Sequence, residues 1–448
     1  MRFSAADLLT VLETHLPLES EGLVLALSGG MDSTALLGAL AQLRDAGLGR
    51  QLPLRAVHVD HGLQAAAADF RAACRGQCEF LGVPLRVLSA AVDRPAGTSI
   101  EAAARDARYA ALAAELEPGE CLLTAHHCDD QAETFLLQAL RGAGLKGLAS
   151  MPLLRSWACG WHLRPLLAWR RADLHAYVAT IGLATVTDPM NADGRFDRVY
   201  LRRELWPLIE ARWPGASQSL ARTAAHAGEA QELLDAIADA DLVSLRDGEA
   251  LRLPRLRGLA PARRVNALRR WLRERTPTLP PAARLVEALR QMLEADGDQL
   301  PAILWDRHAL RRYRDRIFLS VAEPPRLRAT LSWSWRDQAT LELGQGLGAL
   351  QAVTRPGGLE LARMPASLSV RARAGGEVLK PAHRAATRSV QHLCQDLGVL
   401  PWMRDAIPFI CAGDDLLGIG DLWLDARWCD AAGEPGLAFQ WLSGPDFV

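Results

Sequence analysis

The first residues that could do chemistry lie in the segment Ser28-Gly29-Gly30-Met31-Asp32-Ser33. Its two glycines let the backbone approach a ligand closely, and the free N–H groups at the start of a following helix favour an anion of phosphate size. Ser28 and Ser33 add hydroxyl donors, and the Asp32 carboxylate suits a hydrated Mg²⁺ ion. The segment lacks the lysine of the common G-x-x-x-x-G-K-[ST] loop, so it predicts a phosphate site of another class. The structural alternative is an ordinary capped turn between a strand and a helix.

A second group of polar residues follows a strand expected at 120–125. Asp130 and Glu133 are three residues apart, so a helix would place both carboxylates on one face, with His126 one turn earlier. Such a pair could bind an ammonium group and later accept its proton. The alternative for Asp129 and Asp130 is a favourable interaction with the helix dipole. A metal site at the His-His-Cys cluster is disfavoured, because no second group of ligands has a matching spacing.

Cationic side chains accompany these clusters. Arg105 and Arg108 are three residues apart on an expected helix, and Arg141 and Lys146 lie in the glycine-rich segment 141–148. Arginine makes bidentate contacts with phosphates, and a glycine-rich loop suits a mobile contact with a substrate. The alternative for the helix is a solvated face with salt bridges.

The elements that must position these groups alternate between strands and helices. Apolar or alternating runs predict strands at 23–27, 54–63 and 85–88, each followed by a helix. This order predicts a doubly wound parallel α/β sheet, in which ligands bind beyond the carboxyl ends of the strands. The 28–33 segment lies at one such end. Another carries His58, Asp60 and His61, and we expect these residues to line the adenosine side of the phosphate site.

Composition narrows the class of protein. The chain has 448 residues, 49% of them hydrophobic, which suffices for several domains with buried cores. It contains no apolar run long enough to cross a bilayer and no basic N-terminal segment before an apolar core, so we expect a cytoplasmic protein without membrane contact. The eight cysteines form no C-x-x-C pair, which favours reduced thiols over a disulfide framework or a zinc site.

Charge is distributed unevenly along the chain. The formal net charge is −1, yet residues 251–320 contain 16 arginines, no lysine and 7 acidic residues, a local charge of +9. This basic module predicts contact with the phosphates of a nucleic acid. Patterning divides the chain into a parallel-sheet domain at 1–215, a helical basic domain at 216–322, a linker with a β-prone segment at 323–364, and a small α+β domain at 365–448.

Several motifs together resemble one enzyme family. Residues 23 to about 210 contain S-G-G-x-D-S, H-V-D-H-G-L, E-x-x-A-R-x-x-R-Y, T-A-H-H-x-D-D-Q-A-E-T, R-G-x-G-x-x-G-L, R-P-L-L and D-P-x-N-x-D. The series is similar to the motifs of the tRNA(Ile)-lysidine synthetases, which belong to the PP-loop ATP pyrophosphatases. Further matches at 375–377 (G-G-E) and 401–408 (P-W-M-R-D-A-I-P) extend the resemblance to the C-terminal domain.

The resemblance implies a carbon–nitrogen ligase that uses ATP and Mg²⁺. The carbon-2 oxygen of the wobble cytidine in a tRNA(Ile) with a CAU anticodon would attack the α-phosphate of ATP, and pyrophosphate would leave. The ε-amine of L-lysine would then displace AMP and form lysidine. The basic middle domain would bind the tRNA body, and the C-terminal domain would hold the acceptor end. A homodimer is compatible with the sequence.

The resemblance also assigns roles to residues. The Mg²⁺ ligand would be Asp32, and the lysine amine would be held by Asp130 and Glu133. ATP would be bound by Ser28, Gly29, Gly30, Asp32, Ser33, His58, Asp60 and His61. The catalytic residues would be Asp32, Asp130, Glu133, Arg105 and Arg198. Phosphates or tRNA would be contacted by Arg108, Arg141, Lys146 and Arg202.

Two other functions stay open at this point. A sulfur-inserting tRNA enzyme would adenylate a base in the same way but normally needs a pair of reactive or cluster-binding cysteines, so the missing C-x-x-C pair disfavours it. A non-catalytic tRNA-binding protein is disfavoured by the intact Asp32, Asp130 and Glu133. The chain departs from the family pattern at Val199, where an asparagine is usual, and at Met190, where a serine is usual.

Overall fold

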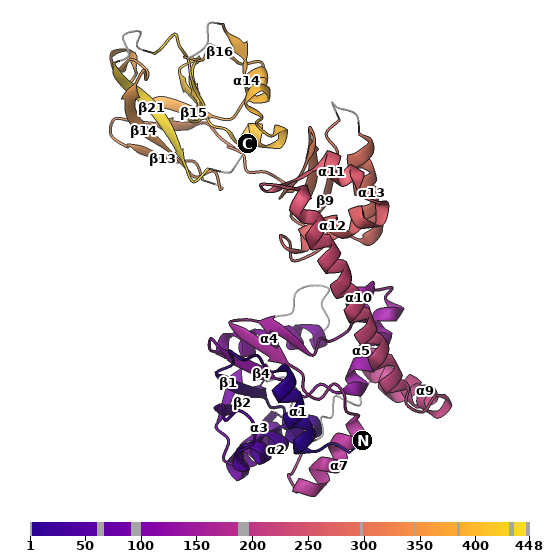
Figure 1. The fold of residues 1–448 in the computed structure, drawn as a ribbon. Helices are drawn as coiled ribbons and strands as arrows, with labels where there is room; N and C mark the ends of the chain where they lie inside the picture. The colour runs from indigo at the N-terminus through magenta and orange to yellow at the C-terminus, as the bar shows by residue number, and fades with distance from the viewer. Residues whose placement is uncertain are drawn as a thin grey trace. The chain divides into compact units, whose positions relative to one another are not determined.

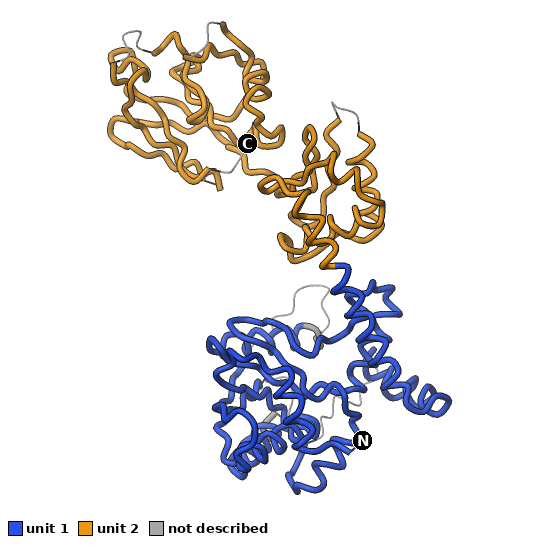
Figure 2. The backbone as a smooth tube through the Cα atoms, viewed as in Figure 1, with its two compact units in different colours: residues 1–234 blue, residues 235–448 orange. Residues whose placement is uncertain are grey.

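The computed structural model describes residues 2–60, 67–90, 100–186, 197–295, 299–344, 346–382, 386–429 and 434–444. The chain separates into two compact units, residues 1–234 and 235–448 (Figures 1 and 2). Within the described ranges, no helix combines the length and the apolar character needed to cross a bilayer. His61 and the D-P-x-N-x-D motif at 188–193, with Met190, lie outside the described residues.

The first unit is built on a six-stranded sheet in the order β3-β2-β1-β4-β6-β5. The strands from β3 to β6 pair in parallel, and β5 pairs antiparallel with β6 at one edge. This arrangement confirms the parallel α/β sheet predicted from the sequence. The strands are β1 Gly22–Ala26, β2 Leu54–Asp60, β3 Leu85–Ser89, β4 Glu120–Leu123, β5 Leu154–Trp157 and β6 Gly160–Leu163.

Both faces of this sheet are covered by helices because its central strands are apolar on both sides. Side chains of a strand alternate between the two faces. Leu23 and Leu25 of β1 therefore join one buried core, and Val24 packs with Leu112 in another. The helices of the unit are α1 Ala5–His15, α2 Met31–Asp45, α3 Ala67–Leu81, α4 Ile100–Glu115, α5 Cys128–Leu140, α6 Leu145–Leu148, α7 Arg171–Ile181, α8 Asp197–Tyr200, the π-helix η2 Leu201–Leu205 and α9 Trp206–Arg212.

Helix α2, which carries Asp32, is held in place by close packing. Ten of its residues are buried, so it is apolar nearly all round. A Cβ atom at Gly38 would lie 2.4 Å from Cδ1 of Ile181, which shows how closely α2 approaches α7. The close approach fixes the start of α2 relative to α7, whose first turn reaches the site described below.

The middle region contains the helices predicted from the sequence and an additional sheet. Helix α10 (Ala216–Leu245) runs from the first unit into the second, and α11 (Leu253–Gly258), α12 (Pro261–Arg273) and α13 (Ala282–Glu294) follow. A five-stranded sheet, which the sequence analysis did not predict, has the order β7-β8-β11-β10-β9. Its strands are β7 Arg246–Asp247, β8 Ala250–Arg252, β9 Ala302–Trp305, β10 His308–Tyr313 and β11 Arg316–Val321. Leu251, Leu310 and Ile317 of these strands share one core with the helices.

The C-terminal region is mainly antiparallel sheet with the single longer helix α14 (Val390–Leu397) among its described residues. The sheets have the orders β12-β15-β18-β19-β20, β13-β14-β21 and β16-β17. Their strands are β12 Leu331–Trp333, β13 Thr340–Glu342, β14 Ala349–Pro356, β15 Leu368–Arg371, β16 Val378–Leu379, β17 Arg388–Ser389, β18 Phe409–Ala412, β19 Asp415–Ile419, β20 Trp423–Leu424 and β21 Pro435–Leu442, and two short 3-10 helices are η3 Leu361–Arg363 and η4 Pro401–Ala406.

The segment predicted as a linker at 323–364 differs from that expectation. Strand β14 pairs with β21 along its whole length, from Ala349 opposite Leu442 to Pro356 opposite Pro435. Strand β12 pairs with β15, and Trp333 is fully buried in the C-terminal core. The segment therefore belongs to the C-terminal body, because its strands complete two of that body's sheets.

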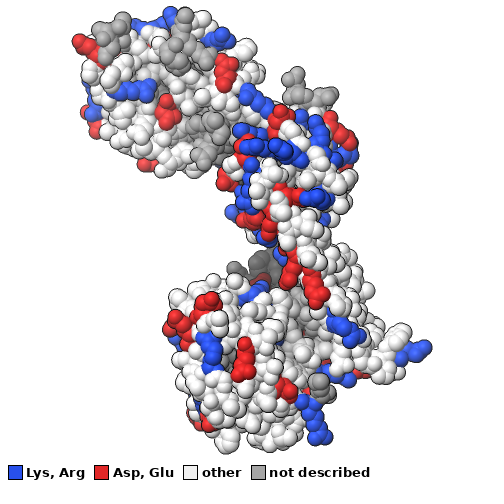
Figure 3. All heavy atoms as spheres, viewed as in Figure 1, with Lys and Arg blue, Asp and Glu red and all other residues white. Residues whose placement is uncertain are grey.

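Charged side chains gather over the middle region of the chain, which belongs to the second unit from residue 235 onward (Figure 3). Many of its arginines are paired within the unit, notably with acidic residues of α10. Arg270 Nε lies 2.7 Å from Asp239, Arg273 lies 3.2 Å from Asp235, and Arg263 forms an ion pair with Asp241. These acids precede the stretch that the sequence marked as basic, so part of its positive charge is neutralised by the neighbouring helix.

Candidate functional site

The 28–33 segment forms a tight turn between β1 and α2. Gly29 has φ +80°, and a Cβ there would lie 3.1 Å from the Cys74 sulfur, so the position favours glycine. The Ser28 and Ser33 hydroxyls lie 2.9 Å apart, and Ser33 Oγ donates to the Gly30 carbonyl at 3.0 Å. Both hydroxyls thus brace the turn. Gly30 caps α2 without a side-chain hydrogen bond, so the first N–H groups of α2 have no side-chain acceptor in the part of the chain that the structure describes.

Asp32 lies in the first turn of α2 and faces three nitrogen-bearing side chains. Its Oδ2 lies 3.7 Å from His127 Nε2, and its Oδ1 lies 3.6 Å from His175 Nε2 and 3.9 Å from Arg171 Nε. Oδ1 is buried and has no hydrogen-bond partner among the described residues. Burial raises the pKa of Asp32, but His127, with the charges of Arg171 and His175, outweighs it and holds the pKa below its ordinary value. The group is an ionised carboxylate with an unused oxygen.

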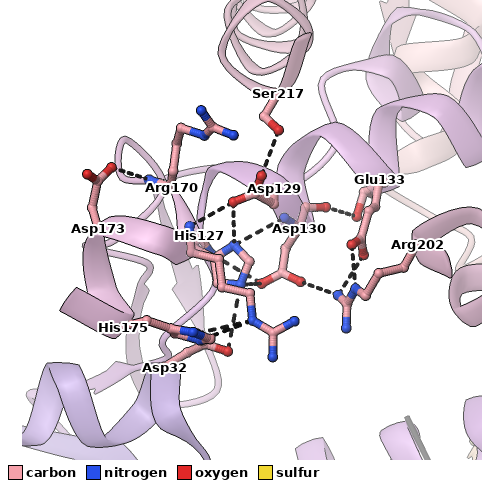
Figure 4. Close-up of polar contacts among 12 residues, drawn as sticks. Asp32, His127, Asp129, Asp130, Glu133, Arg170, Asp173, His175, Arg202 and Ser217 are labelled. Atoms are coloured by element: carbon pink, nitrogen blue, oxygen red, sulfur yellow. Dashed lines mark hydrogen bonds and ion pairs between the residues drawn. The ribbon is translucent and has the colours of Figure 1, made fainter. Parts of the chain in front are cut away.

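His127 occupies the centre of the site, between carboxylates from two helices (Figure 4). It caps α5, and its Nδ1 accepts a hydrogen bond from the Asp130 N–H at 3.4 Å. Its Nε2 lies 3.4 Å from Asp130 Oδ2 and faces Asp32. Burial lowers the pKa of His127, but the charges of Asp130, Asp32 and Asp129 outweigh it and raise the pKa above its ordinary value. The imidazole therefore couples the carboxylate of α2 to the carboxylates of α5.

Neighbouring Asp129 and Asp130 have different surroundings. Asp129 Oδ2 accepts from the backbone N–H of Arg171 at 2.7 Å, and its Oδ1 accepts from the Ser217 hydroxyl at 2.6 Å. Asp129 thus links α5 to the start of α7 and to α10. Asp130 instead points toward His127 and Arg202 (Figure 4). The favourable position of Asp129 near the helix terminus is consistent with the structural alternative for that residue.

Asp130 and Glu133 lie on one face of α5 and share Arg202. Arg202 donates from Nε to Glu133 Oε1 at 2.7 Å and from Nη2 to Oε2 at 2.8 Å, and Nη2 lies 3.3 Å from Asp130 Oδ1. Arg198 Nε lies 3.4 Å from Glu133 Oε2. Burial raises the pKa of Glu133 above its ordinary value despite both arginines. Burial also raises the pKa of Asp130, but His127, His126 and the two arginines outweigh it and lower that pKa.

Arg202 was expected to contact phosphates or tRNA, but the structure places it against the two carboxylates. It lies in the π-helix η2, a wider turn of the kind often found at functional sites. Arg198 also reaches this face, and its Nη2 donates to the Thr134 hydroxyl at 2.7 Å. An ammonium group that enters between Asp130 and Glu133 must therefore share them with a guanidinium.

The remaining cations expected in the site divide into two groups. The guanidiniums of Arg105 and Arg108 lie 5.2 and 5.7 Å from the centre of the Tyr109 ring. Burial, with the charges of Arg105 and Arg198, lowers the pKa of Arg108 despite the opposing effect of Tyr109. Arg141 and Lys146 are exposed, and Arg141 forms only a surface ion pair with Asp197 at 3.4 Å among the described residues.

His58 and Asp60 lie at the end of β2 as expected. His58 is buried, and its Nδ1 lies 2.9 Å from the Leu27 carbonyl oxygen, to which it donates in the Nδ1–H tautomer. Asp60 Oδ2 lies 3.2 Å from Arg71 Nε. The His58 ring therefore supports the backbone just before the 28–33 turn, which leaves Nε2 as the nitrogen available to a ligand.

Three residues that meet at Asp32 are not among those expected in the site from the sequence. His127 belongs to the T-A-H-H motif, where the sequence indicates only the disfavoured metal cluster. Arg171 and His175 are four residues apart at the start of α7, and Arg171 Nε donates to His175 Nε2 at 3.2 Å. The signal that could have found them is this spacing on one helical face. Their proximity to Asp32 depends on the packing of α7 against α2.

Comparisons with known proteins agree along the chain. Residues 4–209 match a PP-loop domain, residues 251–318 a TilS substrate binding domain, and residues 368–441 a TilS substrate C-terminal domain. The tRNA(Ile)-lysidine synthase of Alkalilimnicola ehrlichii is 42% identical over 412 residues, which cover 91% of each chain. That of Methylococcus capsulatus is 38% identical and covers 93% of this chain and 95% of the relative. That of Pseudomonas aeruginosa is 41% identical and covers 94% and 96%. With matches of this extent in all three regions, the chain belongs to the tRNA(Ile)-lysidine synthase family.

Proposed function

We propose that this chain joins the ε-amine of L-lysine to carbon 2 of the wobble cytidine in a tRNA(Ile) with a CAU anticodon, at the expense of ATP. The observation that carries the proposal is the coupling of two carboxylate sites through His127. Asp32 lies in the first turn of α2, at a helix N-terminus suited to phosphates, and its carboxylate and that of Asp130 both face Nε2 of the imidazole.

The first step would occur at the turn that contains Asp32. The cytidine carbon-2 oxygen forms a bond to the α-phosphorus of ATP, and the bond to pyrophosphate breaks. The backbone N–H groups at the start of α2 stabilise the phosphates, and Arg171 of α7 is close enough to Asp32 to contact them. Arg105, Arg108 and Arg198 supply further positive charge for the adenylate.

The Oδ1 atom of Asp32, which is buried and accepts no hydrogen bond from any described residue, fits a divalent cation such as Mg²⁺. His175 and Arg171 lie beside the same oxygen, so phosphate oxygens must complete the surroundings of the cation. When bound, Mg²⁺ would offset the negative charge of the departing pyrophosphate.

The second step would occur at Asp130 and Glu133. Both carboxylates attract the lysine ammonium group, and the raised pKa of Glu133 suits it to accept a proton. The deprotonated amine attacks carbon 2, the bond from carbon 2 to the adenylate oxygen breaks, and AMP leaves. Arg202 keeps the carboxylates in place before lysine arrives.

The buried cysteines support this function over sulfur insertion. Burial raises the pKa of Cys74, Cys121 and Cys128 to about 12 and that of Cys78 to about 11. A thiol with such a pKa is a poor nucleophile at neutral pH, because the thiolate is the reactive form.

The variant Asp32→Asn tests the first step with the full chain, ATP, Mg²⁺ and unmodified tRNA, without lysine. We expect pyrophosphate release to fall by roughly 100-fold or more, the usual effect of removing a preorganised charge in a reaction centre. The control is Asp69→Asn, which changes an exposed carboxylate in the first turn of α3. Equal pyrophosphate release by Asp32→Asn and the unaltered chain would contradict the role of Asp32.

A further inference from the structure

A buried chain of hydrogen bonds connects the carboxyl ends of β4 and β6. His126 Nδ1 lies 2.8 Å from the Thr124 hydroxyl oxygen, which also lies 2.8 Å from His162 Nε2. The second ring nitrogen of His162, Nδ1, lies 3.3 Å from Arg164 Nη2. Thr124, His162 and Arg164 are all buried, so water cannot readily replace these contacts.

The direction of this chain follows from the chemistry of its last member. A guanidinium can only donate, so Nδ1 of His162 must accept and the proton of the neutral ring lies on Nε2. Nε2–H then donates to the Thr124 oxygen. The Thr124 hydroxyl hydrogen is thereby left to donate to Nδ1 of His126, so the proton of the neutral His126 ring must lie on Nε2.

Aromatic packing and nearby charge keep His162 neutral, as this order requires. The rings of Tyr109 and Trp157 lie 5.8 and 5.7 Å from its ring. Burial, with the charges of Arg164, Arg155 and Arg105, lowers the pKa of His162 to about 2. Arg164 is fixed in turn, because its Nη1 donates to the Pro152 carbonyl at 2.7 Å.

His126 itself is half-buried and directly precedes His127, the ring that faces Asp32 and Asp130. The charged groups that act on it are Asp130, Arg164, Arg105 and Arg108. Burial lowers its pKa well below the ordinary value, and the three arginines add to the effect against the opposing charge of Asp130. The ring is thus neutral, and Nε2 has no partner among the described residues.

From this geometry we infer that Thr124, His162 and Arg164 are positioning residues that hold His126 as a neutral Nε2–H donor for a phosphoryl oxygen of the adenylated substrate. A phosphoryl oxygen is the ligand that fits, because the positive charges of Arg105 and Arg108 act on the same ring and favour an anion there, and a neutral imidazole donates without giving up its proton. The choice of ligand rests on the proposed function, whereas the order of protons along the chain does not.

Nitrogen NMR of the full chain, labelled with ¹⁵N-histidine, tests the order of protons directly. Protonated and bare ring nitrogens have well separated chemical shifts, and the His126 signals are identified by their loss in His126→Gln. We expect Nδ1 of both His126 and His162 to be bare and Nε2 of both to carry hydrogen at neutral pH. A His126 ring that is protonated on Nδ1, or doubly protonated, would overturn the inference even if the chain makes lysidine.

Enzyme kinetics test the consequence with Thr124→Val, which removes the hydroxyl and keeps the shape. We expect kcat for lysidine formation to fall about tenfold, the factor for one lost hydrogen bond in the transition state, with KM for ATP unchanged. Thr124→Ser should restore most of the turnover and the wild-type nitrogen shifts of His126. Thr276→Val, which alters a buried threonine in the other unit, should leave kcat unchanged.

Two kinetic results would contradict the inference. One is a Thr124→Val enzyme with wild-type kcat, and the other is an equal loss of kcat in Thr124→Val and Thr124→Ser. If the unaltered chain made no lysidine, the proposed function would fail, while the NMR measurement would still decide the tautomer of His126.

Discussion

Replacement of Glu133 by glutamine should separate the two steps of the reaction. Glu133 is 3% exposed and receives two hydrogen bonds from Arg202, so the change removes a charge from a closed environment while the size of the side chain is kept. A hydrogen bond to a charged group contributes about 1.5–3 kcal/mol. KM for lysine should therefore rise roughly 10- to 150-fold, since 1.36 kcal/mol corresponds to a factor of ten.

Adenylation should be unaffected by Glu133→Gln, because Asp32 keeps its neighbours His127, Arg171 and His175 in this variant. The assay measures pyrophosphate release without lysine and lysidine formation over a range of lysine concentrations. Glu287→Gln is the matched control, because Glu287 accepts from Arg290 at 2.7 Å in an exposed pair outside the first unit. An unchanged KM for lysine, or an equal loss of pyrophosphate release, would refute the assignment of Glu133 to the lysine site.

Three further predictions follow from the same contacts. The pKa of His127 is raised in the folded chain, so the stabilisation from its charge is complete below the unfolded pKa near 6.5 and is lost as the pH rises through the folded pKa. Urea unfolding should therefore show that His127→Gln lowers the unfolding free energy more at pH 6 than at pH 9. An equal loss at both pH values would contradict the charge interaction. A Cβ at Gly160 would lie 2.1 Å from the Glu120 carbonyl oxygen, so Gly160→Ala should lower the unfolding free energy by about 2 kcal/mol or more. Gly76 lies in an exposed and open helical position, so Gly76→Ala should raise the unfolding free energy by up to about 1 kcal/mol. Arg255 and Arg284 are exposed in the middle region, where we expect both to contact tRNA phosphates. Replacement of both by glutamine should weaken tRNA binding and reduce the slope of log affinity against log salt concentration by roughly two. An unchanged slope would exclude these phosphate contacts.

The parallel sheet was predictable because its signals are local. Residues 23–27 form a short apolar run that ends just before two glycines, and the strands at 54–60 and 85–89 are short runs in which apolar residues recur between helices. Other strands lacked such a signal. Strand β10 contains Arg311 and Arg312 beside buried Leu310. The buried guanidinium of Arg312 is tolerated because it donates hydrogen bonds to the backbone carbonyls of Met292 and Ala295. That compensation comes from α13, so the sequence of the strand alone reads as polar.

The carboxylates of the candidate site were predictable from the sequence, but the side chains that contact them were not. Asp32, Asp130 and Glu133 stand out because their motifs place them at helix starts after strands. The pairing of Arg202 with Glu133 joins positions 69 residues apart, and the approach of Arg171 to Asp32 depends on how α7 packs on α2. The different surroundings of Asp129 and Asp130 likewise arise from Ser217 on α10. These relations require the folded chain, because spacing along the sequence carries no information about contacts between distant helices.

Product analysis of one reaction tests the proposed chemistry most directly. The full chain is incubated with ATP, Mg²⁺, labelled L-lysine and unmodified tRNA(Ile) with a CAU anticodon, and the tRNA is then digested to nucleosides. The proposed function requires a labelled lysine-bearing nucleoside in place of the wobble cytidine, with one AMP and one pyrophosphate released for each lysine joined. Release of AMP and pyrophosphate without a lysine-bearing nucleoside, or a tRNA that returns unchanged, would contradict it.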